Sequence, residues 1–368
     1  MPKNTKQFSL SRQKRALLAL EWATAFRPAG SVWVLLLALR GFSLVEIGLA
    51  ETVFHVVSLC CELPSGLLAD LMGRKRTLAA SQVMFFLSAL LMTASQGAGG
   101  VYLSLAFSAV GYNLESGTRE AITYESMLQA GQKAEYLKFS SLQNGVYRFS
   151  ISGAMLLAGA TLMLGWRRAY LLDAGIALAG LAAALTLREP SREAPAVTLR
   201  TLPEALRETV RGAWALLRSD GAAVRIMLVN ALIGTCATLT GFFLQERVEA
   251  VVTVPALLGP ALFALGLGGG LAGLLTGWLD RLPYGRAAAL TGCGVLLCAL
   301  AARGGTLPVL MASGLLAGFF DDSLQLVSDK RLNERFPSAQ RATLVSVSSM
   351  AFSVFMIPLS PVVGWWFS

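Results

Sequence analysis

Charged residues are scarce in this chain of 368 residues: they make up 14% of it, while 55% of the residues are hydrophobic. Soluble globular domains carry about 25% charged residues, so this composition excludes a soluble enzyme, and its apolar content excludes a disordered chain. With one histidine and five cysteines, the sequence shows no cluster with metal-ligand spacing and no obvious disulfide. We therefore expect no metal and no other cofactor.

Signatures of nucleotide and nucleic-acid binding are also absent. The sequence contains no G-x-x-x-x-G-K-[ST] loop, which argues against direct use of ATP. The formal net charge of +9 comes from basic residues dispersed between apolar runs, whereas a nucleic-acid interface gathers them on one surface. The single histidine, His55, has no Ser-His-Asp context. We expect neither an enzyme nor a nucleic-acid partner.

Long apolar runs dominate what is present, and each can cross the hydrocarbon core of a bilayer as a helix. We predict eleven spans, near residues 16–39, 44–69, 77–96, 101–129, 134–164, 168–187, 222–246, 255–280, 284–303, 306–331 and 340–366. Most Lys and Arg residues then fall in inner loops and tails if the N-terminus is cytoplasmic, so the positive-inside rule indicates that orientation. The basic N-terminal segment lacks a small-residue cleavage pattern, and we expect no cleaved signal.

A short charged loop lies between the second and third spans and reads Gly66-Leu-Leu-Ala-Asp70-Leu-Met-Gly73-Arg74-Lys75. Gly66 allows close helix contact, Asp70 sits where a helix ends, and Gly73 permits the chain to reverse. The basic residues hold the loop on the cytoplasmic face. The pattern resembles the signature of the major facilitator superfamily, and a generic positive-inside loop is the alternative. The resemblance implies that Asp70 and Arg74 control the exchange between inward-facing and outward-facing states.

The resemblance covers essentially the whole chain and implies a secondary transporter. Glu62-Leu63-Pro64-Ser65, just before the loop, is similar to one export-type branch of the family. The family fold is all-α, with twelve membrane spans in two bundles of six, and no twelfth span follows the eleventh here. We predict a six-helix N-terminal bundle at 1–187, a cytoplasmic linker with an amphipathic helix at 188–221, and a five-span C-terminal bundle at 222–368.

The fourth span is the most polar of the eleven. Glu115 lies near its midpoint, and Arg119 follows four residues later on the same helical face. Ionisable groups inside a membrane are functional candidates by default, although a purely structural Glu115–Arg119 pair is the alternative. The family signature of this span has an arginine three residues before its glycine. Here Leu114 stands three residues before Gly117, which leaves Arg119 as the candidate replacement.

The second half echoes the first, which suggests a duplicated half with sites near the membrane midplane. Residues 280–286 form a degraded copy of the charged loop, and Gly111–Ser116 aligns with Gly318–Ser323. This register makes Asp322 the counterpart of Glu115.

A carboxylate at the midplane loses hydration, which favours proton binding. Because Arg119 favours the charged form of Glu115, we expect Asp322 to carry protons and Glu115 to meet a cationic substrate or Arg119 itself. Asp321 complicates this choice, since adjacent helix positions point about 100 degrees apart and either aspartate can face the cavity.

Two further carboxylates are candidates for proton coupling. Glu62 belongs to a polar stripe on the second span that also includes Glu51, His55 and Ser58, and such a stripe avoids lipid. Glu21 lies in the first span. His55 has two possible roles: an interior or interfacial residue whose hydrogen bonds are satisfied, or a proton relay.

These features predict a membrane carrier that moves a small organic, amphiphilic molecule outward in exchange for protons. We expect a monomer in the plasma (inner) membrane, with the substrate, protons and the lipid bilayer as its partners. Uptake or facilitated diffusion on the same fold is the first alternative, and flux that persists without a proton gradient favours it. A non-transporting membrane sensor and an integral-membrane enzyme are alternatives of another class, and a chemically altered product favours the enzyme.

Overall fold

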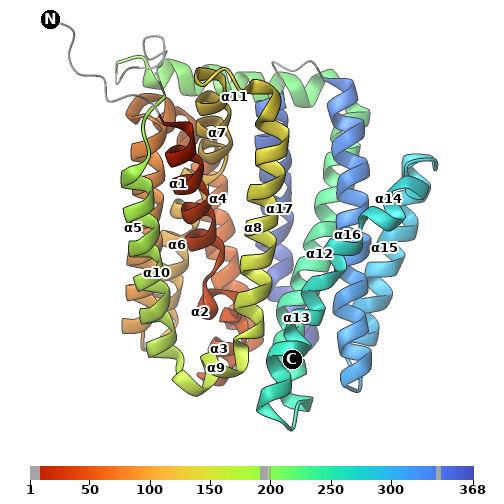
Figure 1. Cartoon of the computed structure of the whole chain (residues 1–368). Coiled ribbons are helices and arrows are strands. Elements are labelled where there is room, and N and C mark those ends of the chain that lie inside the picture. The colour runs from red at the N-terminus through yellow and green to blue at the C-terminus, as the bar shows by residue number, and fades with distance from the viewer. Residues whose placement is uncertain (1–8, 191–197, 199, 337–340) are drawn as a thin grey trace, which may run out of the picture. The chain divides into compact units, whose positions relative to one another are not determined.

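The computed structural model describes residues 9–190, 198, 200–336 and 341–368, and the regular structure in this part of the chain is helical. In chain order, the first helices are α1 (Leu10–Ala25), α2 (Pro28–Ser31), α3 (Trp33–Leu39), α4 (Leu44–Met72), α5 (Arg74–Ala94), α6 (Ala98–Glu115), α7 (Thr118–Gln129), η1 (Lys133–Glu135), α8 (Tyr136–Leu156), α9 (Ala158–Leu164) and α10 (Trp166–Thr186) (Figure 1). They are followed by α11 (Leu202–Ser219), α12 (Gly221–Val251), α13 (Pro255–Leu271), α14 (Gly273–Leu279), α15 (Tyr284–Ala301), α16 (Leu307–Arg335) and α17 (Arg341–Phe367). The predicted all-α fold is confirmed.

Among the described residues, eight helices are long and apolar enough to cross a membrane. They correspond to α4, α5, α10, α12, α13 with α14, α15, α16 and α17. A ninth is obtained if the segment from η1 through α8 and the following α9, which are bent by 54° at their junction, count as one span. The predicted count of eleven is not confirmed, because the first and fourth predicted spans are interrupted helices.

The two interruptions have local causes in the sequence. In the first span α1 ends at Ala25, and Pro28 opens α2, because a proline ring lacks an N–H and cannot continue the preceding helical turn. In the fourth span α6 ends at Glu115, and Gly117 takes a φ of 71°, a left-handed conformation that costs glycine little. α7 then starts at Thr118. The aligned position in the second half is Leu324, and α16 runs through it without a break.

The chain divides into two compact units by internal contacts. Unit 1 comprises Met1–Ser31, Cys60–Ala154 and Trp166–Leu206, and unit 2 comprises Val32–Leu59, Met155–Gly165 and Arg207–Ser368. The predicted linker helix is present as α11, while residues 191–197 and 199 of the linker lie outside the described residues. The domain boundaries drawn from the sequence stay a prediction.

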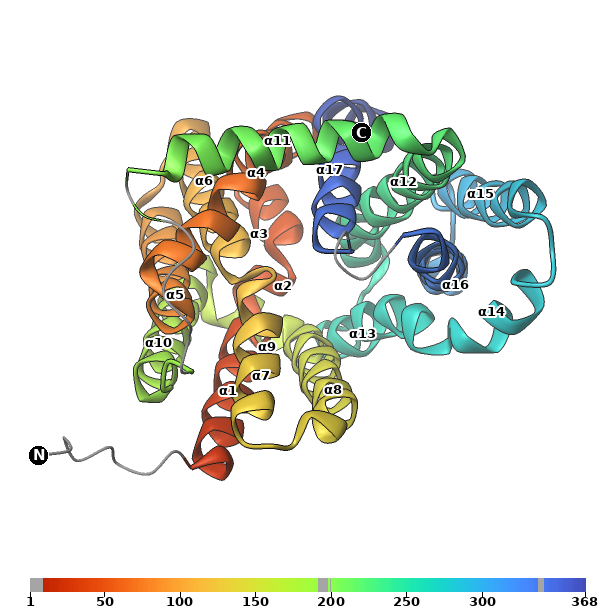
Figure 2. The same ribbon diagram turned by 90° about the horizontal axis from the view of Figure 1, so that it is seen from above.

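In unit 1, α5 packs against both α6 and α10, and α1 packs against α10 (Figures 1 and 2). Their contact surfaces bury Leu17 and Leu20 of α1, Leu78 of α5 and Ile122 of α7 almost completely. Because lipid tails are as apolar as leucine, close packing and interhelical hydrogen bonds, more than transfer out of water, hold such helices together.

In unit 2, α16 is the central helix and contacts α12, α13, α14 and α15 (Figure 2). Small and hydroxyl residues allow this close packing. A Cβ built on Gly268 of α13 would lie 2.8 Å from the backbone nitrogen of Phe319 on α16, and Ser323 donates a hydrogen bond of 3.1 Å to the carbonyl of Ala272. α16 is the helix that carries Asp321 and Asp322.

Candidate functional site

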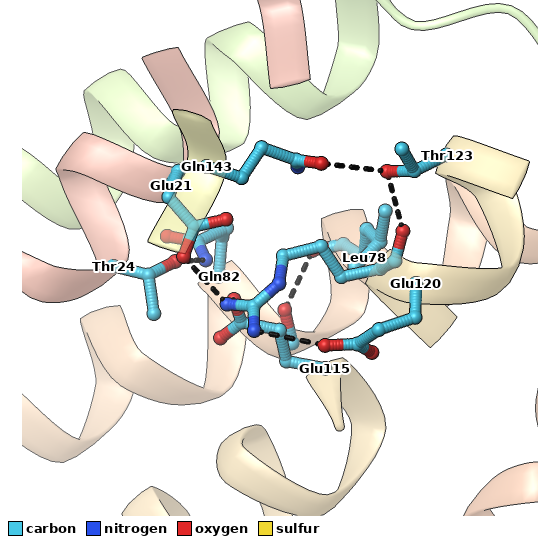
Figure 3. Close-up of polar contacts among 10 residues, drawn as sticks. Glu21, Thr24, Leu78, Gln82, Glu115, Glu120, Thr123 and Gln143 are labelled. Carbon is cyan, nitrogen blue, oxygen red and sulfur yellow. Dashed lines mark hydrogen bonds and ion pairs between the residues drawn. The ribbon is translucent and has the colours of Figure 1, made fainter. Parts of the chain in front are cut away.

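Four charged side chains meet inside unit 1 (Figure 3). Arg119 contacts Glu21 at 2.8 Å and Glu115 at 3.1 Å through Nη1, and Glu120 at 3.0 Å through Nη2. Glu21 is 1% exposed and Glu115 is 5% exposed, whereas the side chain of Glu120 is 53% exposed. We call these four residues the acid–base cluster. One guanidinium therefore bridges two buried carboxylates and a third at the edge.

The break in the fourth span positions part of this cluster. Glu115 is the last residue of α6, and Arg119 lies in the first turn of α7, on the other side of Gly117. The predicted Glu115–Arg119 pair therefore forms, although the uninterrupted helix on which the prediction rested is wrong. Glu21 comes from α1, 98 residues before Arg119, so only packing in three dimensions brings it to the pair.

Polar side chains lie around the acid–base cluster, and not all of their hydrogen-bond donors and acceptors are paired. Thr123 on α7 donates a hydrogen bond of 3.2 Å to Gln143 on α8, and Gln82 on α5 donates one of 2.9 Å to Thr24 on α1 (Figure 3). Within the described residues, Oε2 of Glu21 and Nε2 of Gln143 are buried without a hydrogen-bond partner. Buried polar groups in proteins are normally paired, so an unmet acceptor and an unmet donor mark room for a polar ligand or water.

An apolar groove of about 410 Å3 lies between α1 and α8 in unit 1. It is lined by Trp22, Phe26, Leu142, Gly145, Val146, Phe149 and Ser150. Trp22 and Phe26 stack with ring centroids 5.3 Å apart and an interplanar angle of 16°. Trp22 follows Glu21 and Leu142 precedes Gln143, so the groove shares α1 with the acid–base cluster and α8 with its polar neighbour Gln143.

The carboxylates predicted in the second half lie on α16 and belong to unit 2, whereas the acid–base cluster belongs to unit 1. Asp321 lies against α12, where a Cβ built on Gly234 would come 3.1 Å from its Oδ1 atom. Within the part of the chain that the structure describes, no hydrogen bond or ion pair involves Asp321, and its charged neighbour is Asp322. A carboxylate inside a membrane protein without a cationic partner is a candidate proton site.

The polar stripe of the second span is divided between different partners. In unit 2, the Nε2 atom of His55 lies 3.3 Å from Glu51, and its Nδ1 atom lies 3.1 Å from the hydroxyl of Ser353 on α17. His55 is 6% exposed, as the interpretation of a satisfied interior residue requires. Glu62 belongs to unit 1, where its charge acts on Tyr112, and it is not among the carboxylates that contact Arg119.

The signature loop has the local geometry that the sequence predicts. α4 ends at Met72, Gly73 reverses the chain with a φ of 92°, and Arg74 opens α5. Arg74 pairs with Asp70 at 3.0 Å and with Glu125 of α7 at 3.5 Å. Outside the local backbone of α4, no atom of the described residues lies within 4 Å of a Cβ built on Gly66, so the close helix contact expected there stays a prediction.

The degraded copy of this loop in unit 2 also forms charged contacts, but here the loop supplies the acid and the neighbouring helix supplies the base. Asp280 follows α14 and accepts a hydrogen bond of 2.6 Å from Lys330 of α16. That bond, together with the charges of Lys330 and Arg331, lowers the pKa of Asp280. In the first half a loop arginine pairs with an acid of the fourth span, and here a loop acid pairs with a base of the aligned helix. The two aligned loops thus have in common an ion pair to a neighbouring helix of the same unit.

Glu189 was not singled out from the sequence, yet it contacts the signature loop directly. Its carboxylate accepts hydrogen bonds from the backbone N–H of Arg74, at 2.7 Å, and of Lys75, at 2.8 Å. These are two of the N–H groups that a helix N-terminus leaves unpaired. Glu189 lies two residues after the end of the sixth predicted span, and this position is the one sequence signal for it. Gln143 of α8 was also missed, and no local pattern marks it.

Comparison with known proteins decides the family. A family model described as Major Facilitator Superfamily matches residues 23–302, most of the chain. The chain belongs to the major facilitator superfamily. Its described residues contain no group of three or more His, Cys, Asp or Glu residues that could hold a metal ion.

Two curated relatives are each named as an uncharacterized MFS-type transporter, Rv1877 and its counterpart in a second strain of Mycobacterium tuberculosis. Each is 28% identical to this superfamily member over 207 residues, which is 55% of this chain and 30% of the relative. The aligned part of the chain thus spans less than a third of the length of the curated relatives it matches.

Solved structures share the fold at low sequence identity. A mutant of the nucleoside transporter NupG matches with a TM-score of 0.76 and 15% identity, covering 96% of this chain and 90% of that one. A D-xylose-proton symporter matches with a TM-score of 0.67 and 15% identity, covering 96% and 88%. These likenesses show the fold alone, and they do not test the export-type branch.

Proposed function

We propose that this superfamily member is a proton-coupled secondary transporter that exports a small amphiphilic organic molecule. The observation that carries the proposal is the acid–base cluster, in which Arg119 bridges the buried Glu21 and Glu115. Burying charges is costly unless they are paired, and such groups in membrane proteins line substrate or proton pathways. Outward transport is supported by the resemblance of Glu62-Leu63-Pro64-Ser65 to an export-type branch.

The chemistry of unit 1 favours a substrate with a cationic group and an apolar body. Three carboxylates meet one guanidinium in the acid–base cluster, so an added positive charge balances it better than a negative one. The unpaired Oε2 atom of Glu21 can accept a hydrogen bond from an ammonium group. The apolar groove between α1 and α8 offers aromatic and aliphatic side chains to the apolar body of such a substrate.

We assign the proton to Asp321, which revises the expectation from the sequence that favoured Asp322. Both aspartates lie on α16, but Asp321 packs against Gly234 without a hydrogen bond or ion pair among the described residues. A carboxylate that carries a proton must exist in charged and neutral forms, and a fixed cationic partner would hold it in the charged form.

Uptake by proton symport is the second candidate, and the solved neighbours favour it. One of them is named as a D-xylose-proton symporter and another as a nucleoside transporter, both with the same fold. Facilitated diffusion, a membrane sensor and an integral-membrane enzyme remain the further alternatives.

Flux in proteoliposomes distinguishes these candidates. The purified chain is reconstituted, a pH gradient of either sign is imposed, and labelled lipophilic cations, nucleosides and pentoses are followed across the membrane. Export by antiport predicts that cations move against the proton flow, whereas symport predicts movement with it. Flux that does not respond to the gradient indicates a facilitative carrier, an altered product indicates an enzyme, and no flux of any compound contradicts the proposal.

The signature loop supplies a prediction about conformational exchange. We expect Asp70→Asn and Glu189→Gln each to slow transport about threefold to tenfold while substrate binding is retained. Asp70 pairs with Arg74, and Glu189 caps the α5 N-terminus, where removing a capping group costs about 0.5–2 kcal/mol. Initial rates and equilibrium binding, measured on correctly inserted protein, check this. Glu208→Gln on α11 is the matched control, and wild-type rates in both test variants would rule out the gating role.

Orientation in the membrane is a separate prediction. We expect a cytoplasmic N-terminus and an exterior position for Ser368, because Trp365 and Trp366 at the end of α17 suit the outer interface. A reporter active only in the cytoplasm should be silent when fused after Ser368 and active when inserted after Thr201, before α11. Activity at Ser368 would contradict this topology.

A further inference from the structure

The break in the first span is held by an acid from another helix. Asp173, on α10, accepts hydrogen bonds from the backbone N–H of Ala29, at 3.2 Å, and of Gly30, at 2.8 Å. It lies 144 residues along the chain from Ala29 and is 3% exposed. These residues all belong to unit 1, and the proposed function uses none of them.

The local sequence explains why the break needs an acceptor from outside. The first N–H groups of α2 have no partner within the helix, and a Ser, Thr, Asp or Asn at the N-cap normally accepts from the second and third of them. Here the residue before Pro28 is Arg27, whose side chain has no acceptor atom. The guanidinium of Arg27 instead lies over the ring of Phe85, 4.5 Å from its centroid. Asp173 thus performs the capping role from α10.

This arrangement connects the break to the acid–base cluster. α1 ends at Ala25, one helical turn after Glu21, and α10 packs against both α1 and α2. We infer that Asp173 is a positioning residue: by fixing the α1–α2 junction to α10, it sets the direction of α1 and keeps Glu21 in contact with Arg119. The alternative is a local role, in which Asp173 only satisfies two backbone N–H groups.

A cap supplied within the first span separates these two roles. In the double variant Asp173→Ala with Arg27→Asn, position 173 has no side-chain acceptor, and the new side chain at position 27 can accept from the N–H groups of Ala29 and Gly30, so the break is capped without an acceptor on α10. The double variant should therefore fold, and amide hydrogen exchange of residues 28–31 should return toward its wild-type rate. Arg27→Asn alone is the matched control, because it leaves Asp173 in place.

The measurement is the effect of Glu21→Gln on the midpoint of thermal unfolding, taken in three backgrounds: wild type, Arg27→Asn and the double variant. A positioning role predicts that Glu21→Gln lowers the midpoint in the first two and has less than half of that effect in the double variant, because Glu21 no longer reaches Arg119. An equal effect in all three backgrounds overturns the inference and leaves Asp173 a local cap.

The test requires no substrate, so it is independent of the proposed transport activity. If the coupling between Asp173 and Glu21 is found but no compound is transported, the inference stands and the proposed function fails. If flux is proton-driven but Glu21→Gln has the same effect in every background, the proposed function stands and the inference about Asp173 fails.

Discussion

Replacing Arg119 by glutamine is expected to abolish transport almost completely. The change leaves Glu21 and Glu115 buried, close together and without their cation. Removing one partner of a buried ion pair typically costs about 3–5 kcal/mol, and 1.4 kcal/mol corresponds to about a tenfold change in an equilibrium. If that cost falls on one of the two conformational states, the population of that state drops by roughly a hundredfold or more.

Two matched variants make this result specific. Arg119→Lys keeps the positive charge but loses the planar fork that reaches several carboxylates, so we expect partial activity. Glu120→Gln removes the half-exposed member of the same acid–base cluster and should retain most of the flux, because pairs near solvent contribute little. Initial rates per inserted molecule and the midpoint of thermal unfolding are the measurements. Arg119→Gln protein with more than half of the wild-type flux would show that the acid–base cluster has no part in transport.

Asp321→Asn is expected to separate substrate movement from the proton gradient. Asparagine has nearly the shape of aspartate and cannot change its charge, so the packing against Gly234 is preserved while proton carriage is removed. We expect gradient-driven accumulation to fall to the level of liposomes without protein. Exchange of labelled for unlabelled substrate at equal pH should stay within about threefold of the wild-type rate, because exchange needs no net proton movement.

Asp322→Asn is the matched control for this experiment, since it changes the adjacent position on α16 by the same chemistry. A smaller loss of gradient-driven flux in Asp322→Asn than in Asp321→Asn supports the assignment. The opposite order returns the proton to Asp322, as the sequence alone suggested. Full gradient-driven flux in both variants would move the coupling to unit 1, with Glu115, Glu62 and Glu21 as the next candidates.

Much of the candidate site was visible in the sequence because it depends on near neighbours. Glu115 and Arg119 are four residues apart, as Asp70 and Arg74 are, so the short separation along the chain keeps each pair within reach although a glycine break lies inside both. The positive φ of Gly73 was also predictable, because the chain must reverse within a few residues between two long apolar runs, and glycine adopts such a φ at little cost. The interruption at Gly117 was missed, because glycine is common in membrane helices and does not by itself mark a break.

The sequence by itself determined that the chain is an all-helical membrane protein with the signature of its superfamily, since apolar run length and charge placement are local properties. Only the tertiary structure decided that Glu21 joins Arg119, that Glu189 caps the signature loop and that Asp173 holds the first span. It also distinguished Asp321 from Asp322, which the helical period leaves equivalent. Those contacts depend on which helices pack together, and partners separated by about a hundred residues leave no periodic trace in the chain.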